Sequence, residues 1–257
     1  MFNFDNQLIL VTGAAQGIGA AVVRSLVHTG ATVAGLDIQP NKLESLRTEL
    51  SSQQFECYNV DVSDSLKVEK TVDHIEQKLG AITGLVNVAG ILTYKPIVSL
   101  TEADWARTFA VNTTGVFNIS RSVARVMIPR RGGAIVTVGS NAASVPRQNM
   151  AAYAASKAAA THFTRCLGLE LADVGIRCNI VSPGSTDTPM QHVLWTDKAA
   201  KDAVLRGSLD AFRTGIPLGK IASPEEIAES VLFLLSDKSG HITMHDLRVD
   251  GGATLGA

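Results

Sequence analysis

The chain alternates short apolar runs with helix-period segments along its whole length. The runs predict strands at 8–11, 32–36 (closed by Asp37), 55–60, 84–89, 134–138, 176–181 and 247–249. Helices are predicted at 17–28, about 41–50, about 65–79, from 101 onward, at 150–171 and from 223. Strands that are apolar throughout need cover on both faces, and helical crossovers favour a doubly wound parallel sheet. No linker or repeat divides the 257 residues, so we predict a single α/β domain of about seven strands spanning residues 1–257, with helices on both faces.

Two helix starts carry capping residues. Thr101 is followed three positions later by Asp104, a variant of the capping box. Ser223 precedes Pro224 and stands three residues before Glu226, which marks a second helix start.

The charge and composition of the chain limit the classes of molecule that it can bind. A formal charge of −1, from 23 basic and 24 acidic side chains, gives no electrostatic footprint for nucleic acid or a membrane surface. The three cysteines, Cys57, Cys166 and Cys178, are too widely spaced to indicate a disulfide framework or a zinc site. The start lacks the features of a signal peptide, and the longest uncharged run, 132–146, is shorter than the roughly 18 residues of a membrane helix. We therefore expect a soluble cytoplasmic protein that acts on a small molecule.

A glycine-rich turn follows the first predicted strand. It runs Thr12-Gly13-Ala14-Ala15-Gln16-Gly17-Ile18-Gly19. Glycines let the backbone approach a pyrophosphate, and the helix N-terminus beyond them offers free N–H groups. The spacing is GxxxGxG, which a tight turn alone would also explain. Its place between strand and helix favours a Rossmann-type dinucleotide site, with contacts from Gly13, Gln16, Gly17, Ile18 and Gly19.

Polar residues close the next three strands. The carboxylate of Asp37 would accept hydrogen bonds from an adenosine ribose and repel a 2′-phosphate. No Arg or Lys lies in the glycine turn or just after Asp37 to offset that repulsion. We therefore expect NAD rather than NADP, the alternative being a solvated acid. Asp61, placed at the end of the third strand, either contacts adenine or caps a helix. Asn87, Ala89 and Gly90 close the fourth strand, where such sheets place their ligand crevice.

A second group of polar residues carries chemistry. Tyr153 and Lys157 stand four residues apart and share one helix face. A phenol has a pKa of about 10, and a nearby ammonium favours the phenolate that an alcohol oxidation needs as a base. Ser140, ending the fifth strand, can hold a substrate oxygen. Asn112 lies inside a long helical pattern, where it either holds water or faces solvent.

Together these segments resemble the short-chain dehydrogenase/reductase family across the whole chain. The shared order is Thr12-Gly13-x-x-x-Gly17-Ile18-Gly19, Asn87-Val88-Ala89-Gly90, Asn112, Ser140, Tyr153-x-x-x-Lys157 and Pro183-Gly184-x-x-x-Thr188. Ser140 and Tyr153 are 13 residues apart, as in that family. Val88 stands where asparagine is usual, which bears on a turn more than on the chemistry.

The resemblance implies a role for each position. Tyr153 would be the base, Lys157 would bind the nicotinamide ribose and lower the pKa of Tyr153, and Ser140 would orient the substrate oxygen. Asn112 would keep a relay water, and Thr188 would contact the nicotinamide carboxamide. Pro183, Gly184 and Thr186 would complete the cofactor contacts. Hydride would pass directly to the nicotinamide with no metal. His241 and His245 have the HxxxH spacing of a zinc motif but lack the glutamate of HExxH, so we expect them to be structural or exposed to solvent.

Finer stretches are similar to one group within the family, the 2,3-dihydro-2,3-dihydroxybenzoate dehydrogenases of catechol siderophore synthesis. These stretches are 133–138, 177–179, 182–188, 215–222 and 249–257. They imply an NAD-dependent homotetramer that oxidises a carboxylated cyclohexadiene diol, whose keto product tautomerises to aromatic 2,3-dihydroxybenzoate. Composition and spacing are silent on the substrate.

A carboxylated substrate suggests further contacts. Arg147, between Ser140 and Tyr153, is the candidate for a bidentate carboxylate contact, the alternative being a surface loop. Met190 would contact the substrate, and it lies with Gln191 and Trp195 in a segment of about 185–215 that we expect to fold over the ring as a lid. Ordinary packing or a subunit contact would also explain that segment.

Two other functions stay open. One is a different alcohol dehydrogenase or a 3-oxoacyl carrier-protein reductase, and Asp37 argues against the NADPH-dependent members of that class. The other is a dinucleotide-binding sensor or scaffold that keeps the fold without catalysis. The presence of Asn112, Ser140 and the Tyr153–Lys157 pair argues against it.

Overall fold

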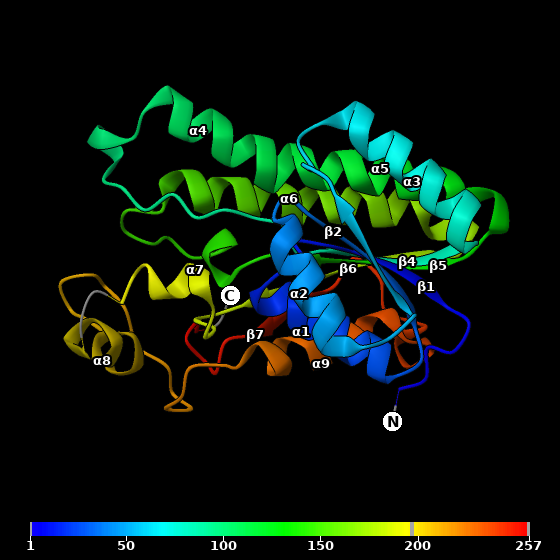
Figure 1. Cartoon of the computed structure of the whole chain (residues 1–257). Helices are drawn as coiled ribbons and strands as arrows, with labels where there is room; N and C mark the ends of the chain where they lie inside the picture. The colour runs from blue at the N-terminus through cyan, green and yellow to red at the C-terminus, as the bar shows by residue number, and fades with distance from the viewer. Residues whose placement is uncertain (1, 196–197, 256–257) are drawn as a thin grey trace.

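Seven parallel strands form one sheet in the order β3-β2-β1-β4-β5-β6-β7 (Figure 1). The computed structural model describes residues 2–195 and 198–255. The strands are β1 (Leu8–Thr12), β2 (Thr32–Asp37), β3 (Phe55–Asn59), β4 (Ile82–Asn87), β5 (Gly133–Val138), β6 (Ile176–Pro183) and β7 (Asp246–Val249). The predicted doubly wound parallel sheet of about seven strands is confirmed.

Helices cover both faces of this sheet, as the apolar strands require (Figure 1). One layer contains α1 (Gly17–His28), α2 (Pro40–Leu50) and α9 (Pro224–Leu235), and the other contains α3 (Ser65–Leu79), α4 (Glu102–Phe109), α5 (Gly115–Met127) and α6 (Ala151–Leu171). Alternate residues of β1 serve the two layers. Ile9 and Val11 belong to the core that includes α1 and α9, whereas Leu8 and Leu10 belong to the core that includes α3 and α5.

Helix starts follow the capping residues. Thr101 and Asp104 form a complete capping box at α4, and Ser223 and Glu226 form another at α9, so both predictions are confirmed.

The fourth strand lies two residues earlier than predicted. It ends at Asn87 because the next two N–H groups, of Val88 and Ala89, are bound by the side chain of Thr12 and not by a neighbouring strand.

The long helix predicted from Thr101 is interrupted. Between α4 and α5 the residues Ala110–Thr114 form a single π-helical turn, a rare geometry that is frequent at functional sites. The buried Asn112 lies in this turn. Its side chain bonds the backbone of another segment, which helical periodicity cannot reveal.

Two helices lie in the segment predicted to form a lid. They are α7 (Pro189–His192) and α8 (Lys198–Arg206), and both were too short for the apolar pattern to predict. Residues 196 and 197 of that segment lie outside the described residues. Among the residues that are described, every helix is too short or too polar to cross a lipid bilayer.

The strand order reverses at β1 and β4, which lie side by side in the middle of the sheet. Connections leave these two strands toward opposite faces, so a crevice opens at their carboxyl ends. The hydroxyl oxygen of Thr12 accepts hydrogen bonds from Val88 N at 3.1 Å and Ala89 N at 3.2 Å, and thereby joins the two strand ends.

Replacing Thr12 by valine tests this junction. The isosteric Thr12→Val change leaves two backbone donors without their acceptor, so we expect the free energy of unfolding to fall by about 1–3 kcal/mol. Urea unfolding at a fixed protein concentration measures it. Thr48→Val on exposed α2 is the matched control and should cost less than about 0.5 kcal/mol. Equal effects of the two changes would contradict the structural role of Thr12.

Candidate active site

A cavity of about 430 Å³ occupies the carboxyl ends of the central strands. Its walls come from the glycine turn, from the chain after β2, β3, β4, β5 and β6, and from α6 and α7. This volume is within the range of about 300–1,000 Å³ for small-molecule sites. Most residues predicted from sequence as site residues line this one cavity.

The glycine turn forms one wall. Gly13 has a φ of +65°, and a Cβ there would lie 2.7 Å from the backbone nitrogen of Ala89, so only glycine fits. Gln16, Gly17 and Ile18 also line the cavity, and α1 begins among them. Gly19 does not line the cavity but packs closely against the carbonyl of Gly13, where a Cβ would lie 2.0 Å from the carbonyl oxygen.

Asp37 lies at the end of β2 with only 8% of its surface exposed. Its two carboxylate oxygens accept hydrogen bonds from Ala15 N at 3.1 Å and Gln39 N at 3.0 Å. These bonds fix the carboxylate in the cavity wall, so the solvated-acid alternative is wrong. The sequence argument missed Lys42, which α2 carries back to the glycine turn, where its Nζ lies 2.5 Å from Gln16 Oε1.

Asp61 and Asn87 differ from expectation. Asp61 lines the cavity two residues beyond the end of β3, and its carboxylate accepts from Ser63 N at 2.9 Å. It does not cap α3, because Asp64 does so. Asn87 lies outside the cavity lining and donates to Ser120 Oγ at 2.9 Å, whereas Ala89 and Gly90 do line the cavity.

Ser140, Tyr153 and Lys157 meet in the cavity wall. Lys157 is 5% exposed, its Nζ donates to the carbonyl of Val138 at 2.8 Å, and burial lowers its pKa to about 8. Burial raises the pKa of Tyr153, and the hydrogen bond with Ser140 acts in the opposite direction. The predicted lowering of the Tyr153 pKa by Lys157 is therefore not found, because burial is the larger effect. Ser140 Oγ also accepts from Ala142 N at 3.1 Å.

Asn112 supports this group from behind. Its Oδ1 accepts from Ile91 N at 2.8 Å, and its Nδ2 donates to Ile91 O and Ser156 Oγ, each at 3.0 Å. It is fully buried and does not line the cavity, so the helix-surface alternative is wrong. With its amide engaged in this way, the side chain holds the chain after β4 against α6.

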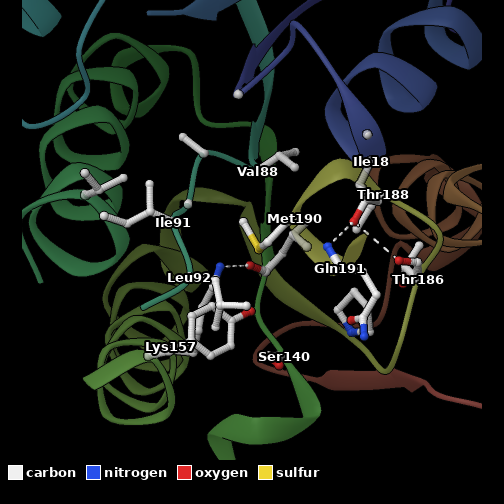
Figure 2. A pocket seen from close by; sticks show the side chains of 18 of the residues that line it. Ile18, Val88, Ile91, Leu92, Ser140, Lys157, Thr186, Thr188, Met190 and Gln191 are labelled. Atoms are coloured by element: carbon white, nitrogen blue, oxygen red, sulfur yellow. Dashed lines mark hydrogen bonds between the residues drawn. The ribbon is translucent and has the colours of Figure 1, made fainter. Parts of the chain in front are cut away.

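The chain after β6 forms the opposite wall. Figure 2 shows Lys157 and Ser140 on one side of the cavity and Thr186 and Thr188 on the other, with Met190 between them in this view. Pro183, Gly184 and Gln191 line it as well. Thr188 caps α7 by accepting from Gln191 N at 3.4 Å. Trp195 lies outside the lining, and Leu194 takes its place.

Arginines complete the cavity. Arg147 lines it as predicted and is partly buried, which excludes a plain surface loop position. Arg213, which no periodic pattern or motif identifies, lines it too. Burial lowers the pKa of both guanidiniums, and the charge of Arg213 adds to the effect at Arg147 while Asp250 opposes it.

The remaining chemistry-bearing residues lie away from the cavity. His241 and His245 are exposed, and Cys57, Cys166 and Cys178 carry free thiols. Within residues 2–195 and 198–255, no three His, Cys, Asp or Glu side chains converge in a way that could hold a metal ion.

Known proteins resemble this chain along nearly its whole length. Residues 13–254 match the family model described as enoyl-(acyl carrier protein) reductase. The chain is 56% identical over 254 residues to the 2,3-dihydro-2,3-dihydroxybenzoate dehydrogenase of Bacillus subtilis (strain 168), covering 98% of this chain and 97% of that one. It is 45% identical over 255 residues to the enzyme of the same name from Escherichia coli (strain K12), covering 99% and 100%.

A solved structure extends the comparison to three dimensions. A gluconate 5-dehydrogenase from Burkholderia cenocepacia J2315 in complex with NADP and tartrate superposes with a TM-score of 0.92 at 31% identity, covering 100% of this chain and 98% of that one. The shared fold, the family model and the whole-length relatives agree. The chain therefore belongs to the short-chain dehydrogenase/reductase family of oxidoreductases, which bind a nicotinamide dinucleotide.

Proposed function

We propose that this chain oxidises 2,3-dihydro-2,3-dihydroxybenzoate to 2,3-dihydroxybenzoate with NAD, as a step of catechol siderophore synthesis. The choice of substrate is supported by the 56% identity, over 98% of the chain, to the Bacillus subtilis dehydrogenase of that name. The observation that carries the reaction is the meeting of Ser140, Tyr153 and Lys157 in one cavity wall.

The proposed chemistry removes a proton and a hydride from one carbinol group. Tyr153, as phenolate, takes the hydroxyl proton, and Ser140 holds the same oxygen through its hydroxyl. Lys157 is held in the cavity wall by the carbonyl of Val138, where its ammonium would bind the nicotinamide ribose. A bound NAD would supply the hydride acceptor. The ketone left behind tautomerises to the aromatic ring, which draws the oxidation forward.

The cavity fits a dinucleotide. Gly13 and Gly17 leave room for a pyrophosphate at the start of α1, and Asp37 offers its carboxylate to a ribose. NAD rather than NADP follows from that carboxylate, which opposes a 2′-phosphate more directly than the single cation of Lys42 attracts it. The segment 185–215 acts as a substrate lid on one domain that spans the chain. Location in the cytoplasm and assembly as a homotetramer complete the proposal.

Other activities fit less well. A 3-oxoacyl carrier-protein reductase that uses NADPH would meet the Asp37 carboxylate at the ribose site. A scaffold without catalysis has no need of a lysine that is 5% exposed beside a half-buried tyrosine, because burying an ammonium costs free energy.

Turnover with a Tyr153→Phe variant tests the reaction. The purified protein mixed with NAD and the diol should form NADH and 2,3-dihydroxybenzoate, followed by absorbance and chromatography. Loss of the proton acceptor in Tyr153→Phe should lower kcat by about a hundredfold to ten-thousandfold. Affinity for NADH, measured by fluorescence, should change little.

Tyr58→Phe is the matched control for this variant. Tyr58 lies on β3 outside the cavity lining, and its hydroxyl has no hydrogen-bond partner within the described residues, so activity should persist. Oxidation of other alcohols but not of the diol would discard the substrate while keeping the dehydrogenase. Full activity in Tyr153→Phe would discard Tyr153 as the base.

The pH dependence of the reaction follows from the raised pKa of Tyr153. Because only the phenolate accepts a proton, a pKa above its ordinary value means that the active fraction is small at neutral pH and grows as pH rises. With NAD and the diol both far below saturation, the rate should rise about tenfold per pH unit between pH 6 and 8. A rate that is flat over this interval would show that the phenol is already ionised. Stopped-flow absorbance at each pH measures it.

Cofactor choice tests Asp37. Asp37→Ser removes the carboxylate that opposes a 2′-phosphate and leaves Lys42 beside the turn, so the ratio of kcat/KM with NADP to that with NAD should rise roughly tenfold to hundredfold. Glu44→Gln is the control, an exposed acid on α2 outside the cavity lining, and should leave the ratio unchanged. An unchanged ratio in Asp37→Ser would reject the role given to Asp37.

A further inference from the structure

We propose that Arg213 acts with Arg147 as a two-arginine clamp for the carboxylate of the substrate, and that the hairpin at 207–215 exists to hold Arg213 there. The inference rests on the proposed function for the identity of the substrate. It adds a second specificity residue, from a distant segment, and gives the chemical class of ligand that the pair selects, a ring acid.

The two guanidiniums share the cavity with the reacting group. Arg147, Arg213 and Tyr153 all line it, together with Met150 and Met190. Arg147 belongs to the loop between β5 and α6, and Arg213 follows α8, so the pair comes from two separate segments. An acid bound between them would have its ring beside Tyr153.

Neither arginine is used by the fold. Within residues 2–195 and 198–255, the side chains of Arg147 and Arg213 form neither a hydrogen bond nor an ion pair with a carboxylate. Arg177, which is buried to a similar degree, shows what a structural arginine looks like here. Its guanidinium donates to the carbonyls of Leu234, Leu235 and Ser236 and to Ser239 Oγ. Both guanidiniums are half-buried in the cavity wall, and neither is paired with a carboxylate within the described residues, so their positive charge is available to an anionic ligand.

The charge balance points the same way. Burial and the neighbouring charge of Arg213 both disfavour the charged form of Arg147. Asp250 is the acid that opposes this effect, yet its oxygens already accept from Gly252 N at 3.0 Å and Asn141 Nδ2 at 3.3 Å. An excess of positive charge remains between the two arginines. A planar carboxylate matches it, because guanidiniums bind carboxylates through paired hydrogen bonds.

The hairpin turns Arg213 inward at a cost in backbone strain. Ser208 and Arg213 exchange two backbone hydrogen bonds, each 2.9 Å long. Phe212 adopts a φ of +50°, which is unfavourable for a bulky residue, and its ring is 87% exposed. Gly207 allows the close approach, since a Cβ there would lie 2.4 Å from the carbonyl oxygen of Arg213. Strain of this kind is retained where the following side chain must point in a set direction.

The hairpin is also tied to the loop that carries the other arginine. Gln148, directly after Arg147, donates from Nε2 to the carbonyl of Asp210 at 3.3 Å. This bond couples the spacing of the two guanidiniums. The segment predicted as a lid thus carries a charged group for the substrate, in addition to the apolar cover from Met190.

Two ligands that differ only in the acid group measure the contribution of the carboxylate to binding. 2,3-Dihydroxybenzoate and catechol share a ring and two hydroxyls, and they differ only in the acid group. Calorimetry with saturating NADH would give their affinities for the wild type, Arg213→Met, Arg147→Met and Arg213→Lys. We expect the ratio of the affinity for the acid to that for catechol to fall about tenfold to hundredfold in each methionine variant, because a hydrogen bond to a charged group typically contributes that much to binding. The affinity for catechol itself should be unchanged. Arg213→Lys should restore part of the preference.

Arg206→Met is the matched control. Arg206 is exposed on the same segment, seven residues earlier and outside the cavity lining, so its loss should leave the preference unchanged. The thermal midpoint of Arg213→Met should not fall, because the side chain has no partner to lose; a loss of the fold would appear there and in NADH affinity.

The outcomes separate the two proposals. If the wild type does not oxidise the diol, the proposed function fails, while the clamp is still judged by the acid-over-catechol preference. A wild type without that preference overturns the clamp. An Arg213→Met variant that weakens both ligands equally, or neither, overturns it as well.

Discussion

The close approach of the chain after β1 to the chain after β4 governs the geometry of the site. Gly13 leaves no room for a side chain against Ala89, and the hydroxyl of Thr12 binds the first two N–H groups beyond β4. Asn112 then fixes the chain just beyond, because its side chain binds both the backbone N–H and the carbonyl of Ile91. Buried polar side chains, not apolar packing, therefore set the shape of the cavity where the strand order reverses. Such bonds are directional, and this property keeps an open crevice from collapsing.

The cavity separates its charges along its length. Asp37 presents a carboxylate at the β2 end, and Lys157, Arg147 and Arg213 present cations toward the other end. Each is at least partly withdrawn from water, so each charge acts over a longer range than it would on the surface. A ligand with hydroxyls at one end and acidic groups at the other matches this distribution in one orientation. Orientation, more than affinity, is what a hydride transfer between two bound molecules demands.

Sequence patterns predicted the sheet, the layers and most of the site because each depends on local signals. Strand hydrophobicity, the capping pairs at Thr101 and Ser223, and the turn glycines are all properties of neighbouring residues. The features that the sequence did not predict have a common physical origin in contacts between distant segments. Asn87 bonds Ser120, Asn112 bonds Ile91, and Lys42 returns to Gln16 through the winding of α2. Arg213 depends on a strained hairpin, and the pKa of Tyr153 depends on burial, neither of which a spacing between two residues can express.

The π-helical turn at Ala110–Thr114 has a consequence for how this chain can change in length. A π turn takes one residue more per hydrogen-bonded ring than an α-helix, and each residue rotates the helix by about 100°. Deleting one residue would restore a regular helix but rotate α5 against α4, and the buried face that carries Ile119, Val123 and Met127 would leave the sheet. A change of one residue in the length of this helix pair would therefore disrupt the packing of α5. Insertions and deletions are tolerated far better in the loops after β6, so related chains can vary their substrates there while keeping the same catalytic frame.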